Sequence, residues 1–370
     1  CVSYTPRLSS YTSSSVTKFL LKPFYRTLGT KVKFLSRSCV LVAAKTRQDM
    51  TKYAGAVKWQ FQMAFNMLGW IPAVSTSSAE LSEAINSMYN WYRLSDVCYV
   101  YLPDVATNLG TKATEDAIRK SRWFTRGWTL QELIAPSGVI FFDSKWGDLG
   151  TKKSLETVIT DITKINGEVL RDANNMGEFS VAQKMSWASE RVTTRVEDIA
   201  YCLLGIFGVN MPTLYGEGDQ AFGRLQEEIM KSTLDHSIFA WTETSYFGHG
   251  LLAPTPACFT NSGNIVQCKN TTASPFTSAN KGINLHLRLK TFDKSILCLA
   301  VLDCYDAMVD DMKLLGIYLE RQSEKSDVFR RIRGDKLGSM GRERVMLDAL
   351  SYQSCCLSVH GLKESGSEVR

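Results

Sequence analysis

The chain has 370 residues, of which 44% are apolar and 11% aromatic, enough for a substantial core and two or three domains. Every apolar run is far shorter than the roughly 18 residues of a membrane span, and the first residues lack the apolar core of a secretory signal. We therefore expect a cytoplasmic protein with no membrane span. No cysteine or histidine spacing matches a zinc site, so we expect no metal. The cysteines in apolar runs are expected to be buried thiols, namely Cys98, Cys202, Cys298 and Cys304.

The formal net charge of +6 arises from one segment of the chain. Residues 1–76 contain 11 lysines and arginines and a single acid, Asp49, whereas residues 77–370 contain 32 basic and 36 acidic residues. A basic protein would suggest nucleic-acid binding, but here the remainder of the chain is slightly acidic, so we expect no nucleic-acid partner. Residues 1–76 also show no sustained periodicity, which predicts a non-native or disordered segment.

The next part of the chain alternates between helical and strand patterns. Apolar spacing predicts an amphipathic helix over 79–94, and the run VCYVYL at 97–102 predicts a buried strand. A polar loop is expected over roughly 105–120. A helix closed by Pro136 and a second buried strand over 138–143 follow. This alternation predicts an α/β layer arrangement.

Two further regions have different patterns. Residues 151–235 are expected to be mainly helical, with a buried apolar segment over 197–207 and a helix over 219–230. From about residue 250 the chain becomes β-rich. Alternation with polar residues predicts a half-exposed strand whose buried positions are Ile283, Leu285, Leu287 and Leu289. Residues 346–370 are predicted to be a loosely ordered tail.

Long ungapped stretches carry a family resemblance. WFTRGWTLQELIAP (123–136), residues 180–218 and SIFAW (237–241), together with SSAELSEAINSMYNWY (77–92), closely resemble the HET domain of fungal heterokaryon-incompatibility proteins. LLAPTPACFTNSGNIV (251–266) resembles the uncharacterised β-rich domain that often follows HET. The resemblance implies an α/β, TIR-like-related HET domain, of which the C-terminal portion lies at 77–245. A β-rich HET-associated domain is implied at 250–345.

The N-terminal half of the HET domain is missing or out of frame. HET domains usually contain a segment resembling YAWVDTCCIDK just before the SSAELSEAI stretch, but MLGWIPAVST stands at 67–76. When the codons are read with a one-base offset, this segment permits TCCIDK, and KPFYRTLG at 22–29 permits the family's opening AILSHTW. We hypothesise that residues from about 17 to 76 are an out-of-frame translation. The strand at 97–102 would then lack neighbours, leaving backbone groups unpaired at a sheet edge, and the chain would be poorly folded or inactive.

The resemblance also marks a set of family-motif positions: Trp123, Arg126, Gly127, Trp128, Glu132, Trp187, Asp198, Gly216 and Gly218. The tryptophans, with Trp241, are expected to pack in the core. Arg126 and Glu132 form either an ion pair, the favoured interpretation, or a functional pair.

The other polar motifs have plain structural interpretations. Glu197-Asp198 fits the start of a helix, whose dipole favours acids there. Gly216-Glu217-Gly218 is predicted to be a turn, because it lacks the phosphate-loop pattern. Asp235-His236-Ser237 contains the residue types of a catalytic triad, but adjacency in sequence does not give triad geometry.

Two function classes remain open. HET membership implies a non-enzymatic signalling module that triggers programmed cell death in vegetative incompatibility, through self-association or partner proteins and without a cofactor. The alternative is a TIR-like enzyme that cleaves NAD, with Glu132 as the candidate catalytic carboxylate. We expect the first class.

Overall fold

The structure is a computed structural model of the chain. It describes the backbone of residues 32–36, 39–42, 78–95, 97–106, 110–243, 250–268, 274–279, 282–292, 296–309, 312–322, 327–347, 350 and 352–357. Apart from two strands, the expected non-native segment at 1–76 lies outside these residues, as does the proposed frame boundary at Ser77.

The first sheet has the order β1-β2-β3-β4-β5. β3 and β4 are parallel, and the other neighbours are antiparallel. β3 is almost wholly buried, as expected for the VCYVY run. The strand bounds are β1 Val32–Ser36, β2 Cys39–Val42, β3 Val97–Tyr101, β4 Val139–Phe142 and β5 Asp148–Thr151.

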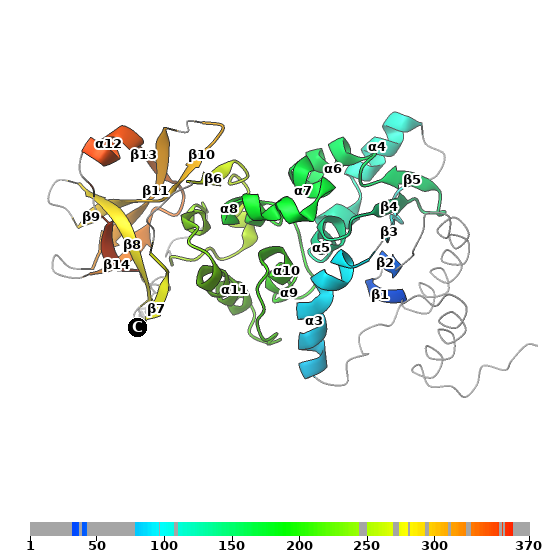
Figure 1. Cartoon of the computed structure of the whole chain (residues 1–370), viewed down its shortest axis with the longest axis horizontal. Coiled ribbons are helices and arrows are strands. Elements are labelled where there is room, and N and C mark those ends of the chain that lie inside the picture. The colour runs from blue at the N-terminus through cyan, green and yellow to red at the C-terminus, as the bar shows by residue number, and fades with distance from the viewer. Residues whose placement is uncertain are drawn as a thin grey trace, which may run out of the picture.

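Helices fill the middle of the molecule, between this sheet and the C-terminal strands (Figure 1). Most are short because turns and capping side chains interrupt them every four to eight residues, and the two longest are α3 and α11. The bounds are α3 Ser78–Arg93, α4 Thr111–Arg119, η1 Arg122–Thr125, α5 Thr129–Ile134, α6 Glu156–Thr163, α7 Gly167–Arg171, η2 Ala173–Glu178, α8 Val181–Ser186, α9 Asp198–Tyr201, α10 Leu204–Phe207, α11 Gln220–Ser232, η3 His236–Phe239 and η4 Pro256–Phe259.

The C-terminal strands close into a small barrel. The pairings run β12-β14-β8-β9-β11, and β11 pairs with β12 again. β7 pairs with β8, and β13 pairs with β11. β6 and β10 form a separate two-stranded sheet. The bounds are β6 Ile265–Gln267, β7 Thr277–Ala279, β8 Gly282–Thr291, β9 Leu297–Val301, β10 Cys304–Asp306, β11 Lys313–Arg321, β12 Val328–Ile332, β13 Gly338–Gly341, α12 Arg342–Leu347 and β14 Tyr352–Leu357.

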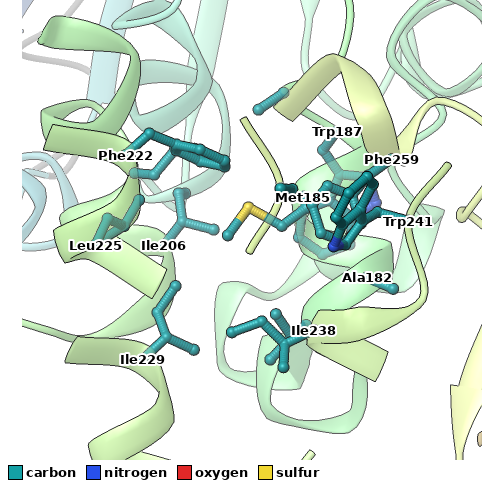
Figure 2. Close-up of a cluster of buried hydrophobic side chains, with 14 of the residues drawn as sticks. Ala182, Met185, Trp187, Ile206, Phe222, Leu225, Ile229, Ile238, Trp241 and Phe259 are labelled. Atoms are coloured by element: carbon teal, nitrogen blue, oxygen red, sulfur yellow. The ribbon is translucent and has the colours of Figure 1, made fainter. Parts of the chain in front are cut away.

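One continuous apolar core joins the helices to the barrel. Part of this core is drawn in Figure 2, where Met185 of α8 faces the side chains of α11. Trp187 lies on the other side, with Trp241 and Phe259. Removing a fully buried side chain of this size costs about 2–5 kcal/mol.

A buried arginine of the barrel crosses into the helical region. Arg331 of β12 donates from Nη1 to the carbonyl of Phe239 (2.9 Å) and from Nη2 to that of Trp241 (2.6 Å). Its guanidinium lies 3.7 Å from the centre of the Trp241 ring, a cation–π contact. Burial lowers the pKa of Arg331 to about 9. The two regions therefore share a desolvated charge as well as a core.

Several sequence predictions are confirmed. The helix at 79–94 and the strand at 97–102 are α3 and β3, and the strand at 138–143 is β4. The mainly helical region over 151–235 is also found. In β8 the four predicted positions are buried, and His286 between them is exposed.

The expected polar loop over 105–120 contains helix α4, so this prediction is wrong. Ile118 is the helix's one buried residue, and a single apolar contact gives too weak a period to reveal a helix in the sequence.

The predicted loose tail at 346–370 contains β14, which lies between β8 and β12 in the barrel. Cys355 and Leu357 of this strand are buried. The strand was missed because its partners are remote in sequence and its own alternation is short. Residues 358–370 lie outside the described part of the chain.

The edge of β3 is also paired, contrary to expectation. β2 aligns antiparallel with it, from Cys39 opposite Val100 to Val42 opposite Val97. Cys98 of β3 is buried as predicted but disulfide-bonded, so the expectation of a thiol is wrong there.

In the described part of the chain, no helix has the length and apolarity that crossing a bilayer requires.

Candidate functional site

Glu132 lies at the bottom of a buried polar centre between α3 and α5. Every residue of α5 is buried, and Glu132 has no exposed surface. Its Oε1 accepts a hydrogen bond from the Tyr92 hydroxyl of α3 at 3.1 Å. Burial raises the pKa of Tyr92 well above its usual value, and the neighbouring Glu132 carboxylate raises it further. Tyr92 therefore stays a neutral donor to this carboxylate.

Arg191 joins the same centre from the loop after α8. Its Nε donates to the carbonyl of Trp187 (3.1 Å), and its Nη1 donates to the carbonyl of Arg126 (2.8 Å) and to Thr129 Oγ1 (2.9 Å). Burial lowers its pKa to about 10, while Cys202 and then Glu132 act in the opposite direction. The guanidinium thus remains charged at neutral pH. No local sequence pattern distinguishes Arg191 from the other arginines.

Lys152, at the end of β5, closes α5 from its C-terminal side. Its Nζ donates to the carbonyls of Leu133 (3.2 Å), Ile134 (3.4 Å) and Pro136 (2.6 Å). These are the acceptors that a helix leaves without intrahelical partners, and a cation there also suits the helix dipole. Burial lowers the pKa of Lys152 to about 8.

Gly127 allows two loops to meet closely. A Cβ at this position would lie 2.4 Å from Thr193 Cγ2 and 3.1 Å from Cys202 Sγ. The Gly127 N–H donates to the carbonyl of Val192 (2.9 Å), and the Val192 N–H donates to that of Thr125 (2.7 Å). The family-motif glycine is therefore explained by the close approach of two backbones.

Asp198 connects this centre to the next loop. Its Oδ1 accepts from the Tyr215 hydroxyl at 2.8 Å, and the Trp128 side chain also donates to it. Burial raises the pKa of Asp198, and the hydrogen bonds from Tyr215 and Trp128 lower it. The Arg195 guanidinium lies over the Tyr215 ring at 4.5 Å.

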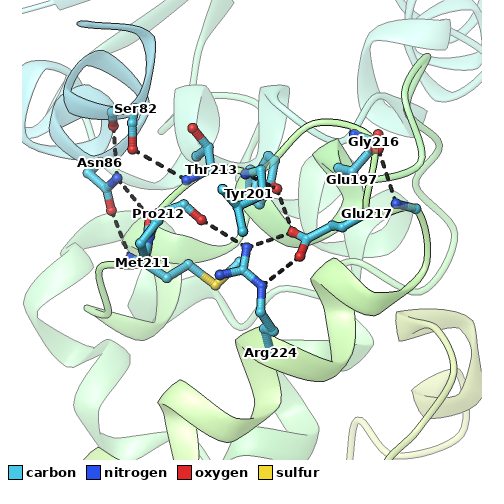
Figure 3. Close-up of polar contacts among 12 residues, drawn as sticks. Ser82, Asn86, Glu197, Tyr201, Met211, Pro212, Thr213, Gly216, Glu217 and Arg224 are labelled. Atoms are coloured by element: carbon cyan, nitrogen blue, oxygen red, sulfur yellow. Dashed lines mark hydrogen bonds and ion pairs between the residues drawn. The ribbon is translucent and has the colours of Figure 1, made fainter. Parts of the chain in front are cut away.

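The turn Gly216-Glu217-Gly218 is held by carboxylates, as Figure 3 shows. Glu197 Oε1 accepts from the N–H groups of Gly216 (2.7 Å) and Gly218 (3.2 Å). Backbone hydrogen bonds, its own first and then those of the two glycines, lower the pKa of Glu197. Both glycines have positive φ, 105° and 60°, which few other residues adopt. The predicted turn is confirmed.

Glu217 points back to the helices. It accepts from the Tyr201 hydroxyl (2.7 Å) and binds Arg224 of α11 through both carboxylate oxygens, at 2.7 and 2.6 Å. Arg224 Nη2 also donates to the carbonyl of Pro212 (2.8 Å). A bidentate pair with these extra bonds is stronger than an ordinary surface ion pair. α3 is attached to the same loop, since Met211 bonds with Asn86.

These contacts form one connected set, which we call the motif network. It runs from α3 through α5 and α9 to α11. Three of the nine family-motif positions contribute side chains to it, and the main chains of Arg126, Trp187, Gly216 and Gly218 are bonded to it. Its members are Tyr92, Trp128, Thr129, Glu132, Arg191, Glu197, Asp198, Tyr201, Tyr215, Glu217 and Arg224.

The tryptophans behave mainly as core residues. Trp123, Trp187 and Trp241 are buried, which confirms the packing interpretation, whereas Trp128 is half-buried and bonded to Asp198. The Arg126–Glu132 pairing stays a prediction. Arg126 is exposed while Glu132 is fully buried, and the Arg191 guanidinium interacts electrostatically with Glu132.

Asp235, His236 and Ser237 do not form a triad. The Asp235 carboxylate accepts from the N–H of Val181 (2.7 Å), and Ser237 Oγ accepts from that of Ala182 (3.0 Å), so both cap α8. His236 Nδ1 lies 3.6 Å from the Asp303 carboxylate and accepts from the Asp303 N–H at 3.3 Å. Burial lowers the pKa of His236. These residues fasten the helices to the barrel.

The contacts of the motif network hold loops relative to one another. Glu132 and Asp198 accept from tyrosine hydroxyls, and Asp198 also accepts from the Trp128 side chain. Glu197 accepts from backbone N–H groups. Within the described residues, no cluster of three or more histidine, cysteine or acidic side chains is arranged to hold a metal ion.

Comparisons with known proteins give two matches. Residues 220–283 match a domain of unknown function, DUF8212. The matched segment runs from α11 into β8. No solved structure gives a significant match.

The second match is to the vegetative incompatibility protein HET-E-1 of Podospora anserina, 50% identical over 161 residues. These residues are 42% of this chain and 12% of the relative, so the chain matches only a small part of that longer protein. The chain is a partial homologue of a fungal vegetative incompatibility protein.

Proposed function

We propose that the chain is a HET-domain signalling protein of fungal vegetative incompatibility. In this proposal it acts in the cytoplasm and promotes programmed cell death through self-association or contacts with partner proteins, without a cofactor. The 50% identity to a vegetative incompatibility protein supports the biological role. The burial of Glu132 beneath Tyr92 is the observation that supports a non-enzymatic mode of action, because a group without exposed surface contacts no substrate.

The NAD-cleaving alternative needs a rearrangement that the signalling proposal does not. A dinucleotide would reach Glu132 only after α3 moved away and the hydrogen bond from the Tyr92 hydroxyl to Glu132 Oε1 was broken. Arg191 donates to the carbonyl of Arg126 and Lys152 to that of Pro136, on either side of α5, and these hydrogen bonds would have to break as well. No feature of the described residues favours this alternative.

We also propose that the chain as written is compromised, because residues from about 17 to 76 are out of frame. The composition change at Ser77 and the two family motifs recovered in one shifted frame support this. Transcript sequencing across Ser77 in several isolates tests it. Transcripts that read in the written frame throughout would overturn this part of the proposal and leave the function untouched.

Controlled expression in a filamentous fungus tests the function. The chain as written and a version with the shifted frame restored would each be induced from the same promoter, and hyphal death would be scored by dye uptake. We expect death with the restored version and little with the written one. NAD content measured in the same hyphae separates the mechanisms, since an early fall in NAD that depends on Glu132 would contradict the non-enzymatic proposal. Survival with both versions would contradict the signalling role.

A further inference from the structure

Exposed aliphatic side chains gather beside the motif network. Val192 is 66% exposed, Val196 52% and Leu214 53%. Single apolar residues on a surface are ordinary, but a contiguous group of them marks a binding surface. Burying each against a partner would contribute about 25 cal/mol for every Å² of apolar surface removed from water.

These side chains belong to adjoining loops. The 192–196 loop is bonded to the 122–127 loop through the backbone of Val192, at 2.7 Å to Thr125 and 2.9 Å to Gly127. It meets the 212–216 loop where Arg195 stacks on Tyr215 at 4.5 Å. We call the exposed surface of these three loops the three-loop patch.

The charged residues of the three-loop patch are all arginines. Arg122, Arg126 and Arg195 are exposed, and the three loops contain no acid. Arg122 lies 3.9 Å from Asp104 but is itself highly exposed. Glu197 and Asp198 border the patch and hold the turn and Tyr215 from inside, and Glu190, two residues before Val192, is exposed. The three loops themselves therefore combine aliphatic surface with three exposed arginines and no acid.

The motif network gives this patch a fixed shape. Arg191 bonds the carbonyl of Arg126, Glu197 bonds the turn at Gly216, and Gly127 lets the first two loops touch. Loops held in their bound shape lose less conformational entropy on association. This offers a reason for buried polar residues at motif positions that perform no chemistry.

We propose that the three-loop patch docks an acidic segment of a partner protein in which carboxylates alternate with aliphatic side chains. The carboxylates pair with the arginines, and the aliphatic groups cover Val192, Val196 and Leu214. This inference deepens the proposed signalling function and rests on it. Nucleic acid is disfavoured as the occupant because aliphatic side chains separate the few arginines, whereas phosphate backbones bind to more extended basic surfaces.

Fluorescence anisotropy with the full chain tests the proposal. The probe is a fluorescein-labelled peptide of alternating glutamate and leucine, about as long as the strands of ordinary sheets. Matched probes replace glutamate by lysine or leucine by serine. We expect both matched probes to bind at least about tenfold more weakly, which corresponds to about 1.4 kcal/mol. Equal binding of the lysine probe, or tighter binding of single-stranded DNA or of vesicles rich in phosphatidylserine, would overturn the proposal.

Substitutions locate the binding site. Val192→Asp with Val196→Asp should weaken binding of the glutamate–leucine probe at least about tenfold, and Arg195→Glu should weaken it as well. The matched control is Met308→Asp with Val309→Asp, because these residues are 76% and 77% exposed in the barrel and lie outside the patch. Thermal melts should be alike for all variants. Equal binding by the patch variant and the control variant would contradict the proposal.

The same variants separate this inference from the proposed function. In the killing assay the substitutions are made in the frame-restored chain. Hyphal death caused equally by the restored patch variant and the restored chain would remove the patch from signalling but leave the function standing. If the restored chain binds the probe through the patch but kills no cells, the docking surface stands and the proposed function fails.

Discussion

Two buried arginines hold different regions of the molecule together. Arg191 acts inside the helical region, where it bonds the carbonyls of Trp187 and Arg126. Arg331 acts between regions, since it leaves the barrel and bonds the carbonyls of Phe239 and Trp241. Burial lowers the pKa of both, to about 10 and about 9. In both places a guanidinium supplies the hydrogen bonds that irregular backbone cannot obtain from a helix or sheet.

The comparison also shows a difference. Around Arg191 there are nearby polar side chains, including Glu132 and Thr129, whereas Arg331 contacts an aromatic ring and bare carbonyls. The helical region therefore distributes its buried polarity over many residues. The barrel junction also contains the buried His236–Asp303 contact, but Arg331 donates to both the Phe239 and the Trp241 carbonyl, so its loss should have the larger effect.

Arg331→Met should produce the largest loss of stability. Two buried carbonyls would lose their donor, and each unsatisfied group costs about 1–3 kcal/mol, so we expect about 3 kcal/mol or more. Urea unfolding measures the change. The control is Arg330→Met on the same strand, which breaks an exposed ion pair with Glu320 and should cost less than about 1 kcal/mol. Equal losses for the two variants would contradict the junction role.

Glu132→Ala should lower the free energy of unfolding by less than Arg331→Met does. It leaves the Tyr92 hydroxyl without its acceptor, at a cost of about 2 kcal/mol. Glu132→Gln retains an oxygen for Tyr92 and should cost about half as much. Exposed Glu190→Ala is the control and should be nearly neutral. If Glu132→Ala proves fully stable in urea, the carboxylate is not a structural member of the network.

Gly127→Ala should cost about 1–2 kcal/mol through overpacking. The new methyl would fall 2.4 Å from Thr193 Cγ2. Thr193→Ser removes that methyl while keeping a hydroxyl for the bond to the Arg195 carbonyl, 2.6 Å in the parent. The double variant should recover part of the loss in a thermal melt. Additive losses would show that the clash lies elsewhere.

Lys152 should give the smallest effect, visible as a pH dependence. Its pKa is about 8 in the fold and 10.5 as the ordinary value. Between these two pKa values Lys152 is mostly protonated in the unfolded chain and mostly deprotonated in the folded chain. Because the unfolded chain binds more protons than the folded chain, the free energy of unfolding rises with pH. From pH 7 to pH 9 the free energy of unfolding of the parent chain should rise by about 1 kcal/mol more than that of Lys152→Met. Exposed Lys153→Met should leave the slope unchanged; a gain of the same size for both variants would exclude Lys152 as its source.

The sequence predicts those elements whose position depends on neighbouring residues. The helix at α3 and the strands β3, β4 and β8 follow from apolar spacing, and the turn at 216–218 follows from its glycines. The sequence could not reveal Arg191 or Arg331, because their partners are main-chain carbonyls that any residue could supply. The pairing of Glu132 with Tyr92 was missed for a related reason: 40 residues separate them, and only the packing of α3 on α5 joins them.

The position of β14 has a consequence for biosynthesis. Its neighbours in the barrel, β8 and β12, leave the ribosome well before it, and β12 can pair with β11 at once. Until residues 352–357 emerge, β8 and β12 each present a row of unpaired N–H and C=O groups, which is the kind of surface that recruits other chains. A premature stop codon between β12 and β14 would leave a nascent chain whose unpaired strand edges chaperones must shield from aggregation.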